Sequence, residues 1–213
     1  MSRKIMGRSG KTPKGLATRA RIVEAATGMF LDRGYVATTV AAIAKGSGVS
    51  AQAVYLAFGS KTAILKAAVD FAAAGDANEI AMAARPWMDQ VRACTDVAAA
   101  LDIVVEHAAA SVERSSPIYE VIRTASADPE VAQLTADITA QRLESVRDII
   151  VSLWGKPGFN PATTFEEAVA IGYMLISPEM FRLLVTDCGW TLPRWRSYLR
   201  DCLEAQMQVS TPA

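Results

Sequence analysis

Histidine and cysteine are scarce in this chain, which limits the metal and redox chemistry that it can carry. Its one histidine, His107, lies in the apolar run VVEHAAA, with no second histidine or cysteine at ligating spacing. An isolated histidine in such a run is more often a hydrogen-bonded core residue than a metal ligand. The three cysteines, Cys94, Cys188 and Cys202, form no CxxC pattern, which favours a reducing cytoplasm over a disulfide framework. We expect no metal, no cofactor and a cytoplasmic location.

Segments that would enter a membrane are also missing. The sequence contains no uncharged apolar run of about 18 residues, so we expect no transmembrane helix. The basic N-terminal residues are followed by no apolar core, which argues against a secretory signal peptide.

Catalytic motifs are absent too. The chain has no GxSxG sequence, and one histidine cannot supply a recurrent acid–base set. The sequence GSKT at 59–62 resembles part of a phosphate-binding loop, but its residue order is wrong and Val54 stands where the loop needs glycine. An enzyme is therefore not expected.

Charge is balanced overall but unevenly distributed along the chain, which has 22 basic and 22 acidic residues. Residues 1–61 hold ten basic and two acidic residues, a net charge of +8, and the remainder carries −8. A basic module joined to an acidic one is expected where one end of a protein binds phosphate groups.

The most specific pattern in the chain is that of two short helices joined by a glycine turn, in residues 38–61. Thr38 or Thr39 can cap the first helix, in which apolar residues recur at helical spacing. Gly46 and Gly48 permit the sharp turn that follows. Helical hairpins are common by themselves, and the basic charge around this one favours DNA binding over an ordinary hairpin.

The second helix of the pair, residues 51–58, follows Ser50 as its N-cap. Val54 and Phe58 lie four residues apart and face inward. The opposite side carries small and polar residues: Ala51, Gln52 and Tyr55. Small residues near the N-terminus of such a helix allow it to approach base edges in the major groove.

Two segments precede this pair. Residues 1–16 lack apolar periodicity and are rich in glycine, lysine and arginine. We expect a flexible basic arm that follows the DNA backbone or enters a minor groove, with a solubilising tail as the alternative. A helix over residues 19–32, ended by Gly34, then leads into the helical pair.

These residues together resemble the DNA-binding domain of TetR-type transcriptional regulators, from about residue 17 to 66. The shared elements are RIVEAA at 21–26, Phe30, Gly34-Tyr35, Thr38-Thr39-Val40, Ile43-Ala44, Gly48-Val49-Ser50, Tyr55, Phe58 and Ser60-Lys61. The resemblance covers roughly a quarter of the chain.

We assign seven residues to the DNA interface: Thr38, Thr39, Ser50, Ala51, Gln52, Tyr55 and Lys61. The resemblance implies that Thr39, Tyr55 and Lys61 contact phosphates. It also implies that Ala51 and Gln52 face base edges, where Gln can pair with adenine and the Ala methyl can contact a thymine methyl.

The chain departs from the family pattern at three positions of the second helix. Ala53, Leu56 and Ala57 stand where the family often has a threonine, an aromatic residue or a histidine. These departures remove phosphate contacts, so operator recognition would depend more on DNA shape and on the basic arm.

Residues 62–213 are long enough for a second helical domain with its own core. Strand patterns are weak, and helix starts are marked at Ser116-Pro117, Asp128-Pro129 and Asn160-Pro161, with a capping box at Thr164–Glu167. The expected helices are 62–84, 95–114, 117–126, 129–153, 161–186 and 192–208. The predicted fold is all-α: a three-helix helix-turn-helix domain (17–61) followed by a larger helical domain for effector binding and dimerisation (62–213).

The last two predicted helices carry apolar stripes suited to a homodimer. The stripe residues are Phe165, Ala168, Gly172, Leu175 and Ile176 on one helix and Trp195, Leu199, Cys202, Leu203 and Met207 on the other. Such stripes can also pack on their own domain. A four-helix interface around a two-fold axis would place two recognition helices on successive major grooves.

A ligand pocket is expected among the middle helices. Soft or aromatic residues suited to lining it are Met82, Trp87, Met88, His107, Tyr119, Phe165 and Met174. Each of them, taken singly, is more often a core residue. Trp87 and Tyr119 combine apolar bodies with polar tips, which favours an aromatic or amphipathic effector.

Three functional hypotheses follow from these patterns. The first is a repressor that a small apolar or aromatic ligand releases from a pseudo-palindromic operator, through a shift of the helix that follows Lys61. The second is a DNA-binding activator or architectural factor without a small-molecule effector. The third is a helical enzyme with a vestigial DNA-binding end.

Overall fold

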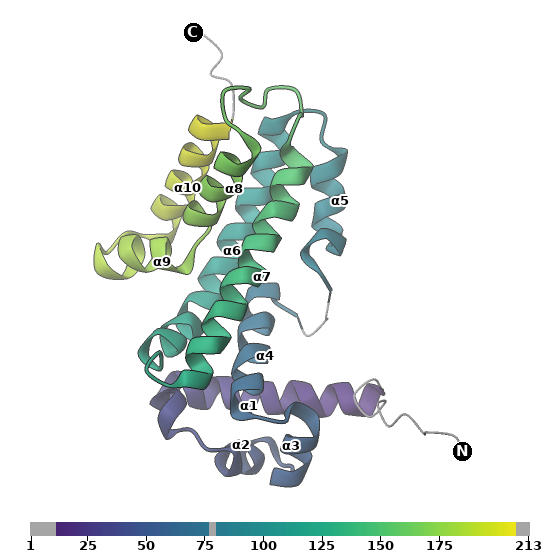
Figure 1. The fold of residues 1–213 in the computed structure, drawn as a ribbon, viewed down its shortest axis with the longest axis vertical. Helices are drawn as coiled ribbons and strands as arrows, with labels where there is room; N and C mark the ends of the chain where they lie inside the picture. Colours follow the sequence, from purple (N-terminus) through teal and green to yellow (C-terminus); the bar gives the residue numbers. More distant parts are fainter. Residues whose placement is uncertain (1–11, 77–79, 208–213) are drawn as a thin grey trace.

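The computed structural model describes residues 12–76 and 80–207, and these residues form helices and no strands. The N-terminal elements are α1 (Pro13–Ala37), α2 (Val40–Ser47), α3 (Ala51–Phe58) and α4 (Lys61–Ala74). Figure 1 shows α1 lying across one end of the molecule, with α2 and α3 on its outer side and α4 rising away from them. Most of the predicted basic arm lies outside the described residues, and residues 13–16 already belong to α1.

The remaining elements form an elongated bundle around two long helices, α6 (Val97–Thr124) and α7 (Pro129–Leu153). The turn between α6 and α7 lies at the same end of the molecule as α1 (Figure 1). The shorter elements are η1 (Met82–Ala84), α5 (Pro86–Ala93), α8 (Phe165–Leu175), α9 (Pro178–Phe181), η2 (Arg182–Asp187) and α10 (Leu192–Met207). In this view α5 lies on one side of the long pair, and α8 and α10 lie on the other.

One predicted helix start, at Asp128-Pro129, and the predicted capping box at Thr164–Glu167 are confirmed by their bonds. The Asp128 side chain accepts a hydrogen bond from the N–H of Glu130 at 2.9 Å, directly before α7. Thr164 and Glu167 form a reciprocal capping box at the start of α8. In both cases, side-chain oxygens satisfy backbone donors that have no partner inside the helix.

Other predicted boundaries are wrong. Gly75 ends α4 with φ 79°, well before residue 84, and the separate helix α5 was not expected. Asn160 closes a turn by accepting from the N–H of Ala162 at 3.0 Å, so no helix starts there. The single helix expected over 161–186 is divided into three elements, because Ser177 caps a new start at Pro178.

The pair Ser116-Pro117 begins no helix either, because α6 continues through it. The Ser116 hydroxyl donates to the Val112 carbonyl at 2.7 Å, back along the same helix, rather than capping a new one. Pro117 lacks the N–H that would bond to the carbonyl of Glu113, and α6 continues without this hydrogen bond. The predicted helices 95–114 and 117–126 are therefore one helix.

One hydrophobic core joins the N-terminal helices to the ends of the two long helices. Its buried members include Ile22, Phe30, Ile43 and Val54 from α1–α3, Ile64, Leu65 and Val69 from α4, Ile118 and Ile122 from α6, and Leu134 and Ile138 from α7. The predicted boundary at residue 61 is therefore not a boundary between two separate cores, because α4 packs both on α1 and on α6 and α7.

The second core lies among α5, α6, α7, α8 and α10, and it contains the stripes that we expected at a dimer interface. Ala168, Leu175, Trp195, Leu199, Leu203 and Met207 are buried in it, and Phe165, Ile176 and Cys202 pack against it. A Cβ on Gly172 would come within 3.1 Å of Val146, so this glycine permits close packing on α7. Most of these stripe residues are buried within one chain and so do not form a subunit interface, whereas Phe165, Ile176 and Cys202 are only half-buried.

In the described part of the chain, no single helix has the length and apolar character needed to cross a membrane. The bent pair Phe165–Leu175 and Pro178–Asp187 passes the same test by length and composition only.

Candidate nucleic-acid interface and ligand cavities

Helices α2 and α3 are fixed relative to each other by capping residues and one left-handed glycine. Thr39 caps α2 by accepting the N–H of Ala42 at 3.1 Å, and Ser50 caps α3 by accepting the N–H of Ala53 at 3.1 Å. Gly48 adopts φ 67° and ψ 33° between them, a conformation that a residue with a Cβ seldom takes. The sequence therefore specifies a tight helix-turn-helix.

The outer face of α3 is accessible to a DNA groove. Val54 is buried beneath the helix, whereas Ala51, Gln52 and Tyr55 are exposed, as the spacing predicted. Neither the Gln52 amide nor the Tyr55 hydroxyl makes a hydrogen bond to the described residues, and Tyr55 is 54% exposed. These polar groups are free to bind an external partner.

The two adjacent threonines before α2 have different roles. Thr39 is exposed, and its hydroxyl can still donate to a phosphate while it caps the helix. Thr38 is fully buried, and its hydroxyl donates to the carbonyls of Gly34 at 2.8 Å and Met29 at 3.2 Å. The assignment of Thr38 to the DNA interface is wrong, because its side chain closes the turn after α1.

Lys61, expected on a phosphate, is engaged inside the domain. Its Nζ donates to the carbonyls of Tyr35 at 2.9 Å and Thr38 at 3.0 Å, and it lies 3.9 Å from the centre of the Tyr35 ring. Burial lowers the pKa of this ammonium below its usual value. In this conformation Lys61 braces α4 against the end of α1.

Two further cations counted in the basic module also brace the motif. Arg21 donates to the carbonyls of Ser47 at 2.9 Å and Gly48 at 3.4 Å, which satisfies the C-terminal end of α2. Arg19 donates to the carbonyl of Ala57 and lies 4.2 Å over the Phe58 ring, at the end of α3. Part of the positive charge therefore positions the recognition helix.

Leu56, which was named only as a departure from the family pattern, is a further exposed residue on the outer face of α3. Leu56 is 81% exposed and lies one helical turn after Gln52 on the outer face of α3. An apolar side chain this exposed on a recognition helix can contact a thymine methyl group. The signal was present in the spacing, because positions 52 and 56 share a face.

Residues 22–68 match the family of bacterial regulatory proteins described as the tetR family. This range contains most of α1 and all of the helix-turn-helix described above. This part of the chain is a DNA-binding domain of the tetR family. TetR-family regulators are DNA-binding transcription factors without enzymatic activity, so the hypothesis of a vestigial DNA-binding end on an enzyme is rejected. No curated protein matches the chain in sequence.

Solved structures share the TetR-family fold along almost the whole chain. A regulator of this family from Rhodococcus sp. superimposes with a TM-score of 0.68 at 17% identity, over 90% of this chain and 98% of its own. NalD, the secondary repressor of the MexAB-OprM multidrug efflux pump in Pseudomonas aeruginosa, has a TM-score of 0.64 at 16% identity, with 92% and 97% covered. A transcriptional regulator from Saccharomonospora viridis, in complex with choline, has a TM-score of 0.65 at 20% identity, with 91% and 99% covered. Identities of this size show the fold alone.

Two cavities lie among the helices that follow the helix-turn-helix. The α5–α6 cavity, of about 450 Å³, lies among α4, α5, α6 and α7. The α6–η2 cavity, of about 710 Å³, lies among α6, α7, α9 and η2. Both volumes are in the range of small-molecule sites.

Four of the seven predicted pocket residues line the α5–α6 cavity: Met82, Trp87, His107 and Tyr119. The other three were wrongly assigned. Met88 is fully buried in the second core, Phe165 packs edge-on against Trp154 at 5.3 Å, and Met174 is 52% exposed on the outside of α8. Apolar character alone could not separate a cavity wall from a core or a surface.

An aromatic pair forms part of the α5–α6 cavity wall. The rings of Trp87 and His107 stack with their centres 4.8 Å apart and their planes 13° from parallel. His107 therefore packs on an aromatic ring, and the pair offers a flat apolar surface with polar edges.

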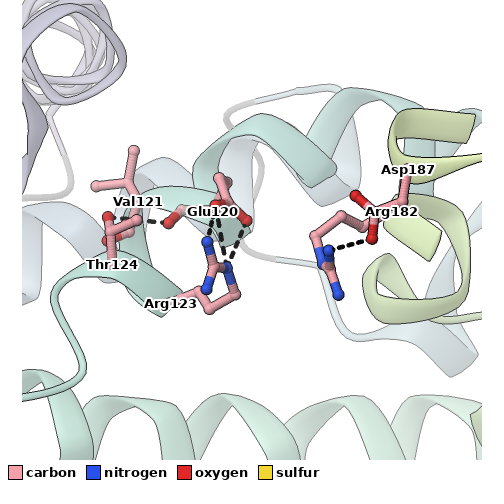
Figure 2. A network of polar contacts seen from close by, with 6 residues as sticks. All are labelled: Glu120, Val121, Arg123, Thr124, Arg182 and Asp187. Carbon is pink, nitrogen blue, oxygen red and sulfur yellow. Dashed lines mark hydrogen bonds and ion pairs between the residues drawn. The ribbon is translucent and has the colours of Figure 1, made fainter.

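The α6–η2 cavity has charged walls (Figure 2). Arg123 pairs with Glu120 on α6, and Arg182 pairs with Asp187 on η2 at 2.5 Å. Hydrogen bonds from Arg123 lower the pKa of the Glu120 carboxyl. Each of these two arginines is paired with one carboxylate, so the four charges sum to zero.

The two cavities meet at four residues that line both: Tyr119, Ile138, Arg142 and Pro178. Burial raises the pKa of Tyr119 to about 12, so its phenol stays protonated at physiological pH. The junction therefore carries one neutral donor and one permanent cation.

Proposed function

We propose that this TetR-family chain is a homodimeric repressor that a small apolar or aromatic molecule, bound in the α5–α6 cavity, releases from a pseudo-palindromic operator. Gln52 and Ala51 face the bases, Leu56 lies beside them, and Thr39 and Tyr55 bind phosphates. Lys61 keeps these groups in place and adds positive charge near the DNA backbone.

One observation carries the ligand-responsive part of this proposal. Val69 and Ile138 belong to the hydrophobic core of the DNA-binding helices and also line the α5–α6 cavity. A molecule in the cavity would therefore contact side chains on which the DNA-binding domain packs. Packed cores shift between discrete arrangements rather than deforming continuously, so this contact can change the position of α4.

Arg114 provides a second connection between the cavity and α4. This cavity-lining residue of α6 donates to the carbonyls of Ala72 at 3.1 Å and Ala73 at 3.0 Å, in the last turn of α4. A ligand that displaces Arg114 would release that end of α4. In a dimer, a shift of α4 changes the separation of the two recognition helices.

The structural neighbours support the proposal by analogy. NalD is described as a repressor, and the Saccharomonospora viridis regulator was solved with choline bound. Proteins with this fold can thus repress transcription and bind a small molecule.

For the dimer, we infer an interface on the outer surfaces of α8 and α10. Met174 is 52% exposed on α8 and Tyr198 is 40% exposed on α10. These two helices contact each other within the chain. Their outer faces could therefore combine into one four-helix interface around a two-fold axis.

The experiment that tests the repressor proposal begins by selecting an operator from random double-stranded DNA with the full chain. Fluorescence anisotropy then measures operator affinity in the presence of a panel of small apolar compounds. A compound that weakens operator binding, and that the substitution Ala108→Trp in the cavity wall makes ineffective, supports the proposal. Operator binding that no compound or cell extract changes would favour an activator or architectural factor without an effector.

A further inference from the structure

Arg142 of α7 stands at the junction of the two cavities with part of its hydrogen-bonding capacity unused. Its side chain is only 16% exposed. Nη1 donates to Oε2 of Glu179 at 2.8 Å, and the guanidinium lies 4.3 Å over the ring of Tyr173. Nε is buried without a hydrogen-bond partner, and Nη2 also has none among the described residues.

The unpaired atoms have a specific geometry. Nε and Nη2 form one edge of the planar guanidinium, and this edge can bind a carboxylate through two parallel N–H···O bonds. A buried cationic donor without a partner is costly, so such a group calls for a ligand or a water molecule. The edge is therefore suited to an oxygen anion.

Tyr119 supplies a second donor on the same wall. Its hydroxyl makes no hydrogen bond to the described residues, and burial keeps its phenol protonated. Arg142 and Tyr119 line the same cavity, and their unpartnered N–H and O–H groups can bind the two oxygens of one carboxylate once a small movement of the guanidinium exposes its buried Nε.

The nearby carboxylates do not satisfy this edge. Asp70 accepts from Lys66 at 2.7 Å, and the Gln141 amide donates to its other oxygen at 3.4 Å. Glu179 bonds to Nη1 alone, at the other end of the guanidinium. Lys66 and Arg142 balance these two acids, so an incoming anion meets a locally neutral site with unused donors.

We propose that the effector is an apolar monocarboxylate, whose carboxylate binds the Nε–Nη2 edge of Arg142 and the Tyr119 hydroxyl. Its apolar body lies in the α5–α6 cavity, along the stacked rings of Trp87 and His107. This inference rests on the proposed function, because it names the chemical class of the molecule that would release the operator.

The test compares acids with matched neutral amides on the full chain. Isothermal titration calorimetry measures the binding of 4-phenylbutyrate, decanoate and their primary amides. At least one acid should bind roughly ten- to a hundredfold more tightly than its amide, as expected for paired hydrogen bonds to a charged group. Arg142→Gln should abolish this preference while the amide still binds, which shows that the cavity remains folded.

Arg147 offers a matched control on the same helix. It also lies over an aromatic ring, that of Phe165 at 5.5 Å, and it pairs with Glu166, but it lines neither cavity. Arg147→Gln should therefore leave the preference for the acid unchanged. Equal loss of acid binding in both variants would overturn the proposal.

The remaining outcomes separate this inference from the proposed function. Equal binding of acid and amide by the unmodified chain, or an acid preference that persists in Arg142→Gln, would overturn the carboxylate site. Choline or neutral compounds that release the operator, where no acid binds, would also overturn it and leave the repressor proposal intact. Acid binding that depends on Arg142 but leaves operator affinity unchanged would support the carboxylate site and contradict the proposed release.

Discussion

The hydroxyl of Thr62 donates to Oε2 of Glu130 at 2.7 Å, which joins the first turn of α4 to the first turn of α7. The Tyr35 hydroxyl lies 2.9 Å from the same Thr62 oxygen and extends the contact to α1. Arg142 lies about three turns further along α7, in the cavity wall. One rigid helix therefore connects the cavity to a polar contact on the DNA-binding domain.

This connection predicts that Glu130→Gln weakens the response to ligand more than it weakens DNA binding. Glutamine keeps the size of the side chain, but it replaces the charged oxygen that accepts the hydrogen bond from Thr62 with a neutral one. The ligand-induced loss of operator affinity should become roughly two- to tenfold smaller. Anisotropy titrations with and without a releasing compound measure this change. Asp137→Asn is the control, because Asp137 accepts from Gln133 within α7 itself; a similar effect there would contradict a specific role for Glu130.

Local capping chemistry made much of the fold predictable from the sequence. Asp128, Thr39 and Ser50 each bond to a backbone N–H two or three residues ahead, so the sequence alone contains both partners. The failures came where the outcome depended on distant packing. Ser116, like Asp128, is a capping residue type that precedes a proline. Its hydroxyl donates instead to the Val112 carbonyl in the preceding turn, because α6 packs on the core both before and after Pro117.

The site was predictable only where exposure followed from helix periodicity. The spacing of Val54 placed Gln52 and Tyr55 outward on α3. Lys61 could face either DNA or the carbonyl of Tyr35. The choice depends on how α4 packs against α1, which the residues around Lys61 do not reveal. The apolar stripe around Trp195 was similarly ambiguous, since a buried helix face looks the same whether it packs on its own chain or on another.

Base recognition by α3 can be separated from phosphate binding by two substitutions. Gln52→Ala should change which sequence is selected from random DNA, because the amide is the main polar group that faces the bases. Tyr55→Phe should weaken binding to all sequences about equally, by roughly two- to tenfold, because it removes one phosphate contact. Selection followed by sequencing, together with anisotropy, measures both effects. An unchanged operator preference in Gln52→Ala would show that the assignment to bases is wrong.

Lys61→Met should reduce stability as well as DNA affinity. Methionine retains the apolar stem but removes the donor to the Thr38 carbonyl and leaves the Tyr35 carbonyl with only the Thr38 N–H, at 3.2 Å. We expect a loss of about 1–3 kcal/mol in the free energy of unfolding. Urea unfolding followed by circular dichroism measures it, with the exposed Lys45→Met as the control. Equal stability of the two variants would show that the internal bonds of Lys61 contribute little.

The raised pKa of Tyr119 predicts a pH dependence with a definite sign. The phenol has a pKa of about 12 in the folded chain, against an ordinary pKa of 10.0 in the unfolded one. Above pH 10 the unfolded state loses this proton first, so the free energy of unfolding should fall by about 1.4 kcal/mol per pH unit from this group. Below pH 10 the phenol is protonated in both the folded and the unfolded state, so its contribution to the free energy of unfolding no longer changes with pH. Tyr119→Phe should show a correspondingly shallower decline in urea unfolding between pH 9.5 and 11, and parallel profiles would contradict the burial of this phenol.

The outer face of α8 provides the test of the dimer. Met174→Glu places a charge at a position that is 52% exposed in one chain but would be buried between two. Burying an unpaired charge costs several kcal/mol, so the variant should be monomeric at concentrations where the unmodified chain is dimeric. Sedimentation equilibrium measures the mass, and Val36→Glu, at an exposed position next to the helix-turn-helix, is the control. Because two linked recognition helices bind a palindrome far more tightly than one, the monomer should also lose operator affinity while each domain stays folded. A Met174→Glu variant that remains dimeric would place the interface on another face of the bundle.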